Sequence, residues 1–227
     1  MNTSSSIRKI NFEEIDKASY TKACISILKY NFKIIVNLNV LVSIVFIVLA
    51  PLIFSLKLLD YNNVARIGEF YLSIIGIILI PYLSNIENRN NIKEVVYSRQ
   101  VSNVKIVISR IISIMILMFF MILGVMAVAK VQGSSFQILE ITFGTWISAA
   151  FLGVIGFTAA NLSSNVPLGY LISFAYYLME FMNHGKYTKD LYLFSLTNGS
   201  FENGKYLLLF ITLVMLVFNL VIIKRKS

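Results

Sequence analysis

Residues 104–128 read VKIVISRIISIMILMFFMILGVMAV, and this stretch decides the fold. It is 25 residues long, and its only charged members, Lys105 and Arg110, lie in its first third. A helix rises about 1.5 Å per residue and needs roughly 20 residues to cross the hydrocarbon core of a membrane. The stretch therefore predicts a membrane-spanning helix. Blocks of similar character occupy residues 34–56, 67–83, 138–160, 166–182 and 206–223.

Six such blocks predict an all-α membrane protein with six transmembrane helices, because lipid offers the backbone no water to bond with. Composition agrees, since 57% of the residues are hydrophobic and only 14% are charged, against about 25% charged in a soluble domain. We expect a cytoplasmic amino-terminal arm (1–33), a six-span domain (34–223) and a short cytoplasmic tail (224–227). The 227 residues leave no room for a separate soluble domain.

Basic residues are concentrated in alternate gaps between the blocks. A net charge of +9 does not indicate nucleic acid here, because the positions of the charges follow the spans. Cytoplasmic loops carry the excess of Lys and Arg, so both termini are predicted to lie inside the cell. Thirteen basic residues lie on the predicted inner side: Arg8, Lys9, Lys17, Lys22, Lys29, Lys33, Arg89, Lys93, Arg99, Lys105, Lys224, Arg225 and Lys226. Six lie on the outer side: Lys57, Arg66, Lys130, Lys186, Lys189 and Lys205.

The arm before the first block has the pattern of an amphipathic helix. Asn11 stands three residues before Glu14, a capping-box spacing, and Glu13 suits the positive end of a helix dipole. The alternatives are an elbow helix lying in the membrane interface and a solvated helix packed on the spans. One face of this predicted helix carries Phe12, Ile15, Tyr20, Ala23, Ile27, Tyr30 and Ile34.

The gap between the second and third blocks carries a second amphipathic pattern. Apolar residues at helical spacing, with charges around them, predict a short helix at about residues 88–99. Such a helix could lie on lipid headgroups, or it could be a docking element whose apolar ridge fits a groove on a soluble partner. The candidate docking residues are Glu87, Arg89, Ile92, Lys93, Glu94, Val95, Val96 and Arg99.

The layout resembles the membrane subunit of a type 2 ATP-binding cassette (ABC) exporter over nearly the whole chain. In that family an elbow helix precedes six spans, and a Glu-containing coupling helix, a Ser and basic residues follow the second span. Where many members have a proline, this chain has Gln100 or Val101. A long outer segment with short apolar helices also precedes the last span, and here DLYLFSL (190–196) lies within residues 183–205. The corresponding residues, in order, are Glu87, Lys93, Glu94, Tyr97, Ser98, Arg99, Ser102 and Arg110.

The chain lacks the motifs for ATP hydrolysis. A phosphate-binding loop ends in Gly-Lys followed by Ser or Thr, whereas Lys186 and Lys205 are each followed by Tyr. The resemblance therefore implies a separate ATPase subunit that binds ATP and Mg²⁺. Catalysis and metal binding are not expected either, because His184 is the single histidine and metal sites and Ser–His chemistry need such residues.

Polar residues inside apolar blocks are costly and are therefore functional candidates. Glu180 could line a substrate path, pair with a neighbouring span or lie among headgroups, and Arg110 is expected to extend to headgroups. The possible path comprises Glu180, Tyr176, Tyr177 and Asn37.

Two further patterns in the blocks predict contacts between helices. Asn37, Asn39 and Asn219 are expected to hydrogen-bond across helices. Gly153 and Gly156 form a small-residue face that allows close helix approach.

The expected function is that of the permease half of an ATP-driven exporter in a bacterial cytoplasmic membrane, working with a second permease subunit. The family resemblance implies an amphipathic or hydrophobic cargo, such as an antimicrobial peptide, a drug or a lipid-linked molecule. The alternative is a stand-alone membrane protein, either an energy-independent carrier or a toxin-immunity factor. A third possibility, an intramembrane hydrolase, lacks the expected motifs.

Overall fold

The computed structural model describes residues 38–85, 103–198 and 203–226. Within these ranges every regular element is a helix, apart from an isolated bridge between Asp60 and Ser135. The predicted elbow helix and the predicted helix at 88–99 lie outside the described residues. The elements are α2 (Leu38–Ile53), α3 (Tyr61–Arg66), η1 (Ile67–Leu72), α4 (Ile74–Leu79), η2 (Pro81–Asn85), α7 (Asn103–Val131), α8 (Ile138–Ser163), α9 (Val166–Asn183), η3 (Lys189–Leu191), η4 (Ser195–Asn198) and α10 (Asn203–Lys226).

Each predicted block contains one helix or one nearly continuous helical stretch. Four of these are long and apolar enough to cross a membrane: Tyr61–Ser84, Ile106–Val131, Ile138–Ser163 and Asn203–Arg225. The described part of α2 is a shorter apolar helix of 16 residues, and α9, with 18 residues, is not among the four. The prediction of an all-α protein is therefore confirmed for the described residues, and these four helices are candidate membrane spans that indicate a membrane protein.

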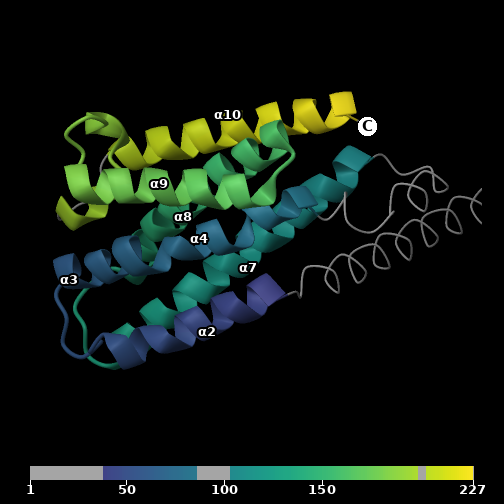
Figure 1. Cartoon of the computed structure of the whole chain (residues 1–227). Helices are drawn as coiled ribbons and strands as arrows, with labels where there is room; N and C mark the ends of the chain where they lie inside the picture. Colours follow the sequence, from purple (N-terminus) through teal and green to yellow (C-terminus); the bar gives the residue numbers. More distant parts are fainter. Residues whose placement is uncertain (1–37, 86–102, 199–202, 227) are drawn as a thin grey trace, which may run out of the picture.

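The helices run alternately back and forth (Figure 1). As a result, the start of α2 at Leu38 and the end of α10 at Lys226 lie at the same end of the bundle. The start of α3 and the end of α9 lie at the opposite end.

Helix α8 lies in the middle of the bundle and contacts α4, α7, α9 and α10. Small residues let its neighbours approach closely. A Cβ added at Gly76 of α4 would fall on the carbonyl group of Ala149, and one added at Gly153 would meet Ile80. A Cβ at Gly169 of α9 would likewise meet the backbone of α8. The predicted small-residue face is thus confirmed, with α4 on one side and α9 on the other.

Asparagine side chains link helices across the bundle, as expected. Asn219 of α10 accepts a hydrogen bond from Asn161 at 2.9 Å and donates one to Thr158 at 2.7 Å, both on α8. Asn39 of α2 donates to the hydroxyl of Tyr170 on α9 at 3.0 Å.

The side chain of Arg110 does not lie where the sequence predicts, at the lipid headgroups. Its side chain is only 4% exposed, so it is buried within the protein rather than extended toward headgroups. The expectation treated Arg110 as a lone side chain at a helix end, whereas the folded chain covers it.

The connection between α9 and α10 folds over the end of the bundle that includes the start of α3. It contains two short 3₁₀ helices, η3 and η4. Leu193 and Phe194, between these two helices, and Leu196 in η4 are fully buried. This apolar segment coincides with the DLYLFSL stretch, so its hydrophobicity is explained by burial in this end of the bundle.

Candidate functional site

The predicted site residues fall into two groups. Glu180, Tyr176 and Tyr177 lie on α9 and are described by the structure. The coupling-helix residues and Asn37 lie outside the described residues, namely Glu87, Arg89, Ile92, Lys93, Glu94, Val95, Val96, Arg99 and Asn37.

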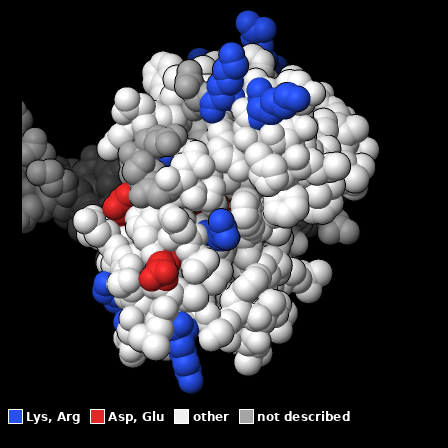
Figure 2. All heavy atoms as spheres, turned by 90° about the vertical axis from the view of Figure 1, so that its left-hand side faces the viewer, with Lys and Arg blue, Asp and Glu red and all other residues white. Residues whose placement is uncertain are grey.

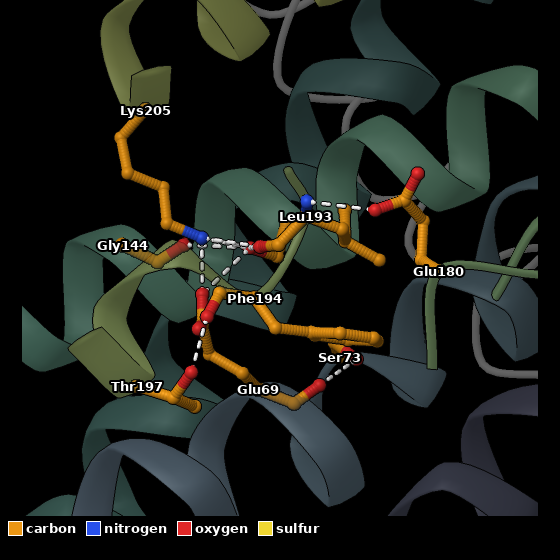
Figure 3. A network of polar contacts seen from close by, with 9 residues as sticks. Glu69, Ser73, Gly144, Glu180, Leu193, Phe194, Thr197 and Lys205 are labelled. Carbon is orange, nitrogen blue, oxygen red and sulfur yellow. Dashed lines mark hydrogen bonds and ion pairs between the residues drawn. The ribbon is translucent and has the colours of Figure 1, made fainter. Parts of the chain in front are cut away.

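Glu180 is buried, and its side chain points at the segment between α9 and α10 (Figure 3). One carboxylate oxygen, Oε2, accepts a hydrogen bond from the Thr188 hydroxyl at 3.1 Å and one from the Leu193 amide at 3.4 Å. Carboxylates bonded to backbone amides make strong, charge-assisted contacts. The described part of the connection between α9 and α10, residues 184–198, closes this end of the bundle and is named the closing segment. Glu180 therefore anchors the closing segment.

The two tyrosines next to Glu180 pack inside the protein. The Tyr177 hydroxyl donates to the carbonyl of Phe70 at 2.6 Å, and its ring lies edge-on to Phe194 at 5.5 Å. Tyr176 contacts Phe151 edge-to-face at 5.6 Å between ring centroids. These contacts connect α9 with η1, α8 and the closing segment.

A buried ion pair between Glu69 and Lys205 lies at the same end of the bundle, and both side chains are fully buried. The Lys205 ammonium group donates to Glu69 Oε1, to Ser148 Oγ at 2.6 Å and to the Leu193 carbonyl at 2.6 Å (Figure 3). An ammonium group has three protons to donate, so each one has an acceptor. The pair joins η1, α8, α10 and the closing segment at one point.

The peptide unit of Leu193 connects the ion pair with Glu180. Its carbonyl accepts from Lys205 and its amide donates to Glu180. Two carboxylates and one ammonium group are thereby held on opposite sides of a single buried residue.

The second helical stretch, Tyr61–Ser84, has a local irregularity next to Glu69. The helix is π-helical over Ile67–Leu72, and the Ser73 amide donates to the Gly68 carbonyl, five residues back, at 3.0 Å. That shift leaves the Glu69 carbonyl without its usual amide donor, and the Ser73 hydroxyl supplies the missing hydrogen bond. Single π-helical turns within α-helices are frequent at functional sites. The π-helical turn, together with the burial of its carboxylate, therefore marks Glu69 as a functional candidate.

The contact between Ser148 and Lys205 has the geometry of a nucleophile and its base. A lysine can act as base only when it is neutral, whereas Lys205 is paired with a carboxylate and donates all three of its protons. Ser148 is also fully buried, which leaves no access for a substrate in this conformation. The arrangement is suited to holding helices and the closing segment together rather than to acyl transfer.

Two cavities accompany these helices. One is an apolar groove of about 470 Å³ between α7, α8 and α10, whose lining includes Ile116, Phe120 and Leu213. The other is a polar pocket of about 510 Å³ beside η1 and the closing segment. Among the residues that the structure describes, no group of three His, Cys, Asp or Glu side chains could hold a metal ion.

Tyr192 separates the buried carboxylates from the polar pocket. It lines that pocket and is 9% exposed. Burial raises the pKa of its hydroxyl, the nearby charges of Glu69 and Glu180 raise the pKa further, and a hydrogen bond with Thr197 opposes them. Tyr192 therefore stays neutral at physiological pH, and its side chain lines the pocket.

Sequence reasoning missed Glu69. A usable signal was present, because Glu69 is a carboxylate inside the apolar block 67–83, and ionisable residues in spans mark functional candidates. Lys205 stands just before the last block, where it counts as an ordinary outer-side charge. Its partner is 136 positions away, and no local pattern connects the two.

No protein-family model, curated protein or solved structure matches this chain. The resemblance to type 2 ABC exporters therefore remains a prediction from the order of residues in the sequence.

Proposed function

We propose that the chain is the permease subunit of an ATP-driven type 2 ABC exporter in a bacterial cytoplasmic membrane. In this proposal all six helices cross the bilayer and both termini are cytoplasmic. A separate ATPase supplies the energy, and a second permease subunit, identical or a sister, completes the path for an amphipathic or hydrophobic cargo.

The observation that carries the proposal is the alternation of the helices. It brings the described start of α2, the end of η2, the start of α7 and the end of α10 to one end of the bundle (Figure 1). Those are the parts of the chain where the basic residues are concentrated. Burial of Lys205 also removes one of the six outer-side charges from the loops. The asymmetry in the number of basic residues along the chain favours a cytoplasmic location for that end.

The second helical stretch offers a route for force. Its carboxyl-terminal end, η2, precedes the predicted coupling helix in the sequence. Its middle packs against α8 at Gly76, and η1, in its amino-terminal half, contains Glu69. In the proposed mechanism, ATP binding draws the ATPases together and pushes on residues 88–99. A displacement of packed helices of this kind is one of the known modes of switching. It would reach α8, α10 and the closing segment through the Glu69–Lys205 pair.

Copurification tests the proposal. We expect a soluble ATPase to copurify with the protein in mild detergent, and Glu94→Lys to release it without changing membrane insertion, because the change reverses a charge in the docking element. Lys57→Glu, a charge reversal at the opposite end of the bundle, is the matched control and should retain the ATPase. Absence of any ATPase would favour the stand-alone carrier or toxin-immunity factor, and an ATPase retained by the Glu94→Lys variant would contradict the docking role.

A further inference from the structure

The polar pocket at the end of the bundle has the composition of an anion-binding site. Its lining includes Arg66 from α3 together with His184 and Lys189 from the closing segment. No aspartate or glutamate is among its described lining residues. Its volume of about 510 Å³ lies within the range of small-molecule sites, roughly 300–1,000 Å³.

The basic side chains of this pocket have no hydrogen-bonding or ion-pair partner within the described part of the protein. Arg66, His184 and Lys189 make no side-chain hydrogen bond or ion pair there, in contrast to Lys205, whose protons are all bonded. The buried carboxylates lie behind the pocket wall, where Glu69 is neutralised by Lys205 and Glu180 is hydrogen-bonded to the closing segment. The described lining of the pocket therefore carries an excess of positive charge.

The backbone around the pocket is held in an uncommon conformation. His184 has φ of +47° and Lys189 has φ of +44°, values that cost energy for residues with a side chain. Gly185 between them has φ of +75°, and a Cβ there would meet the ring of Tyr192. The fold thus maintains His184 and Lys189 at the pocket despite this strain.

Figure 2 looks onto this end of the bundle, where basic side chains outnumber acidic ones among mostly uncharged residues. Phe70 and Tyr192 add aromatic walls to the pocket, which suit the carbon atoms of a ligand next to its charged group. Arginine binds phosphate through two parallel hydrogen bonds, and lysine binds it as a point charge. The chemistry therefore favours a phosphate group attached to an apolar or glycerol-like body.

We propose that the pocket lined by Arg66, His184 and Lys189 binds the phosphate group of an amphiphile. Arg66 and Lys189 neutralise its charge, His184 and Thr197 provide additional hydrogen-bonding groups, and Phe70 and Tyr192 contact the adjoining carbon skeleton. The site does not depend on the proposed transport function, because it would bind this ligand on the chain by itself.

Binding of a short-chain phosphatidic acid tests the site. The full chain is purified in an uncharged maltoside detergent, so that no other phosphate competes, and titrated with dihexanoyl phosphatidic acid, with dihexanoylglycerol and with inorganic phosphate. We expect saturable binding of the phosphatidic acid and at least about tenfold weaker binding of the uncharged dihexanoylglycerol. Competition by inorganic phosphate would identify the phosphate group alone as sufficient, whereas binding of the amphiphile without such competition would identify a lipid as the ligand.

Charge-removing variants distinguish the pocket from general surface charge. We expect Arg66→Gln and Lys189→Gln each to weaken binding by about tenfold or more, and Arg66→Lys to weaken it less than Arg66→Gln, because lysine keeps the positive charge but loses the paired hydrogen bonds. Lys186→Gln is the matched control, because it removes an exposed charge from the same segment outside the pocket lining. Equal weakening by Lys186→Gln, unchanged binding in the Arg66→Gln, Lys189→Gln double variant, or equally tight dihexanoylglycerol binding would overturn the proposal. Monodisperse elution of each variant checks that it is folded.

Discussion

The middle of the bundle and its end at η1 are held together by different kinds of contact. In the middle, Gly76 and Gly153 bring the backbones of α4 and α8 into contact, with no charged group between them. At the end, Lys205 joins Glu69, Ser148 and Leu193 through hydrogen bonds. Small residues fix the distance between two helices, whereas the charged network fixes the position of a non-helical segment.

The difference follows from the backbone hydrogen bonds that each region has or lacks. Helices satisfy their own backbone hydrogen bonds, so their contacts in the middle need only complementary shape. The closing segment has few helical hydrogen bonds, and its buried carbonyl and amide groups need partners from side chains. Lys205 and Glu180 supply those partners on the two sides of Leu193.

The largest expected effect is at the ion pair. Lys205→Ala leaves the Glu69 carboxylate buried without its counter-ion, which costs about 3–5 kcal/mol. Thermal unfolding in detergent should show a large loss of stability. The Glu69→Leu, Lys205→Met double variant removes both charges and should recover most of that loss. A Lys205→Ala variant as stable as the wild type would mean that charge does not hold this end together.

The next effect is in the middle of the bundle. Gly76→Ala places a methyl group on the Ala149 carbonyl, so α4 and α8 must separate, at a cost of about 1–3 kcal/mol. Gly124→Ala is the matched control, because a Cβ at Gly124 meets nothing within 4 Å. It should be neutral or stabilising, since alanine favours helix over glycine by about 0.5–1 kcal/mol. Equal melting temperatures for the two variants would remove the case for close packing at Gly76.

Glu180 tests whether the closing segment has its own anchor. Glu180→Gln keeps an oxygen acceptor for Thr188 and Leu193 but removes its charge, so we expect a smaller loss of about 1 kcal/mol. Limited proteolysis within residues 184–198 should become faster, while the helices remain protected. Met182→Ala, at an exposed position of the same helix, should leave the proteolysis rate unchanged. The same result for both variants would assign the anchoring to the ion pair alone.

The two regions also differ in how far sequence could predict them. Bilayer thickness sets the length of apolar blocks, so the helices follow from the blocks, and Gly153 and Gly156 could be assigned to an interface because small residues have few other roles there. The π-helical turn could not be predicted, because it accompanies a tertiary contact between Gly68 and Thr145. Glu69 could have been recognised as a candidate from its position in an apolar block, but its partner depends on the folding of the closing segment.

The smallest expected effect concerns the polar contact between α8 and α10 toward the end of the bundle opposite η1. Asn219 contacts Asn161 and Thr158 on α8, and hydrogen bonds between spanning helices contribute about 0.6 kcal/mol on average, because an unpaired side chain in the membrane finds other partners. We expect a double-mutant cycle with Asn219→Ala and Asn161→Ala to give a coupling energy of that size. Thermal unfolding of the four proteins in detergent measures it. A coupling as large as that of the ion pair would show that a polar contact also determines how α8 and α10 pack at this end of the bundle.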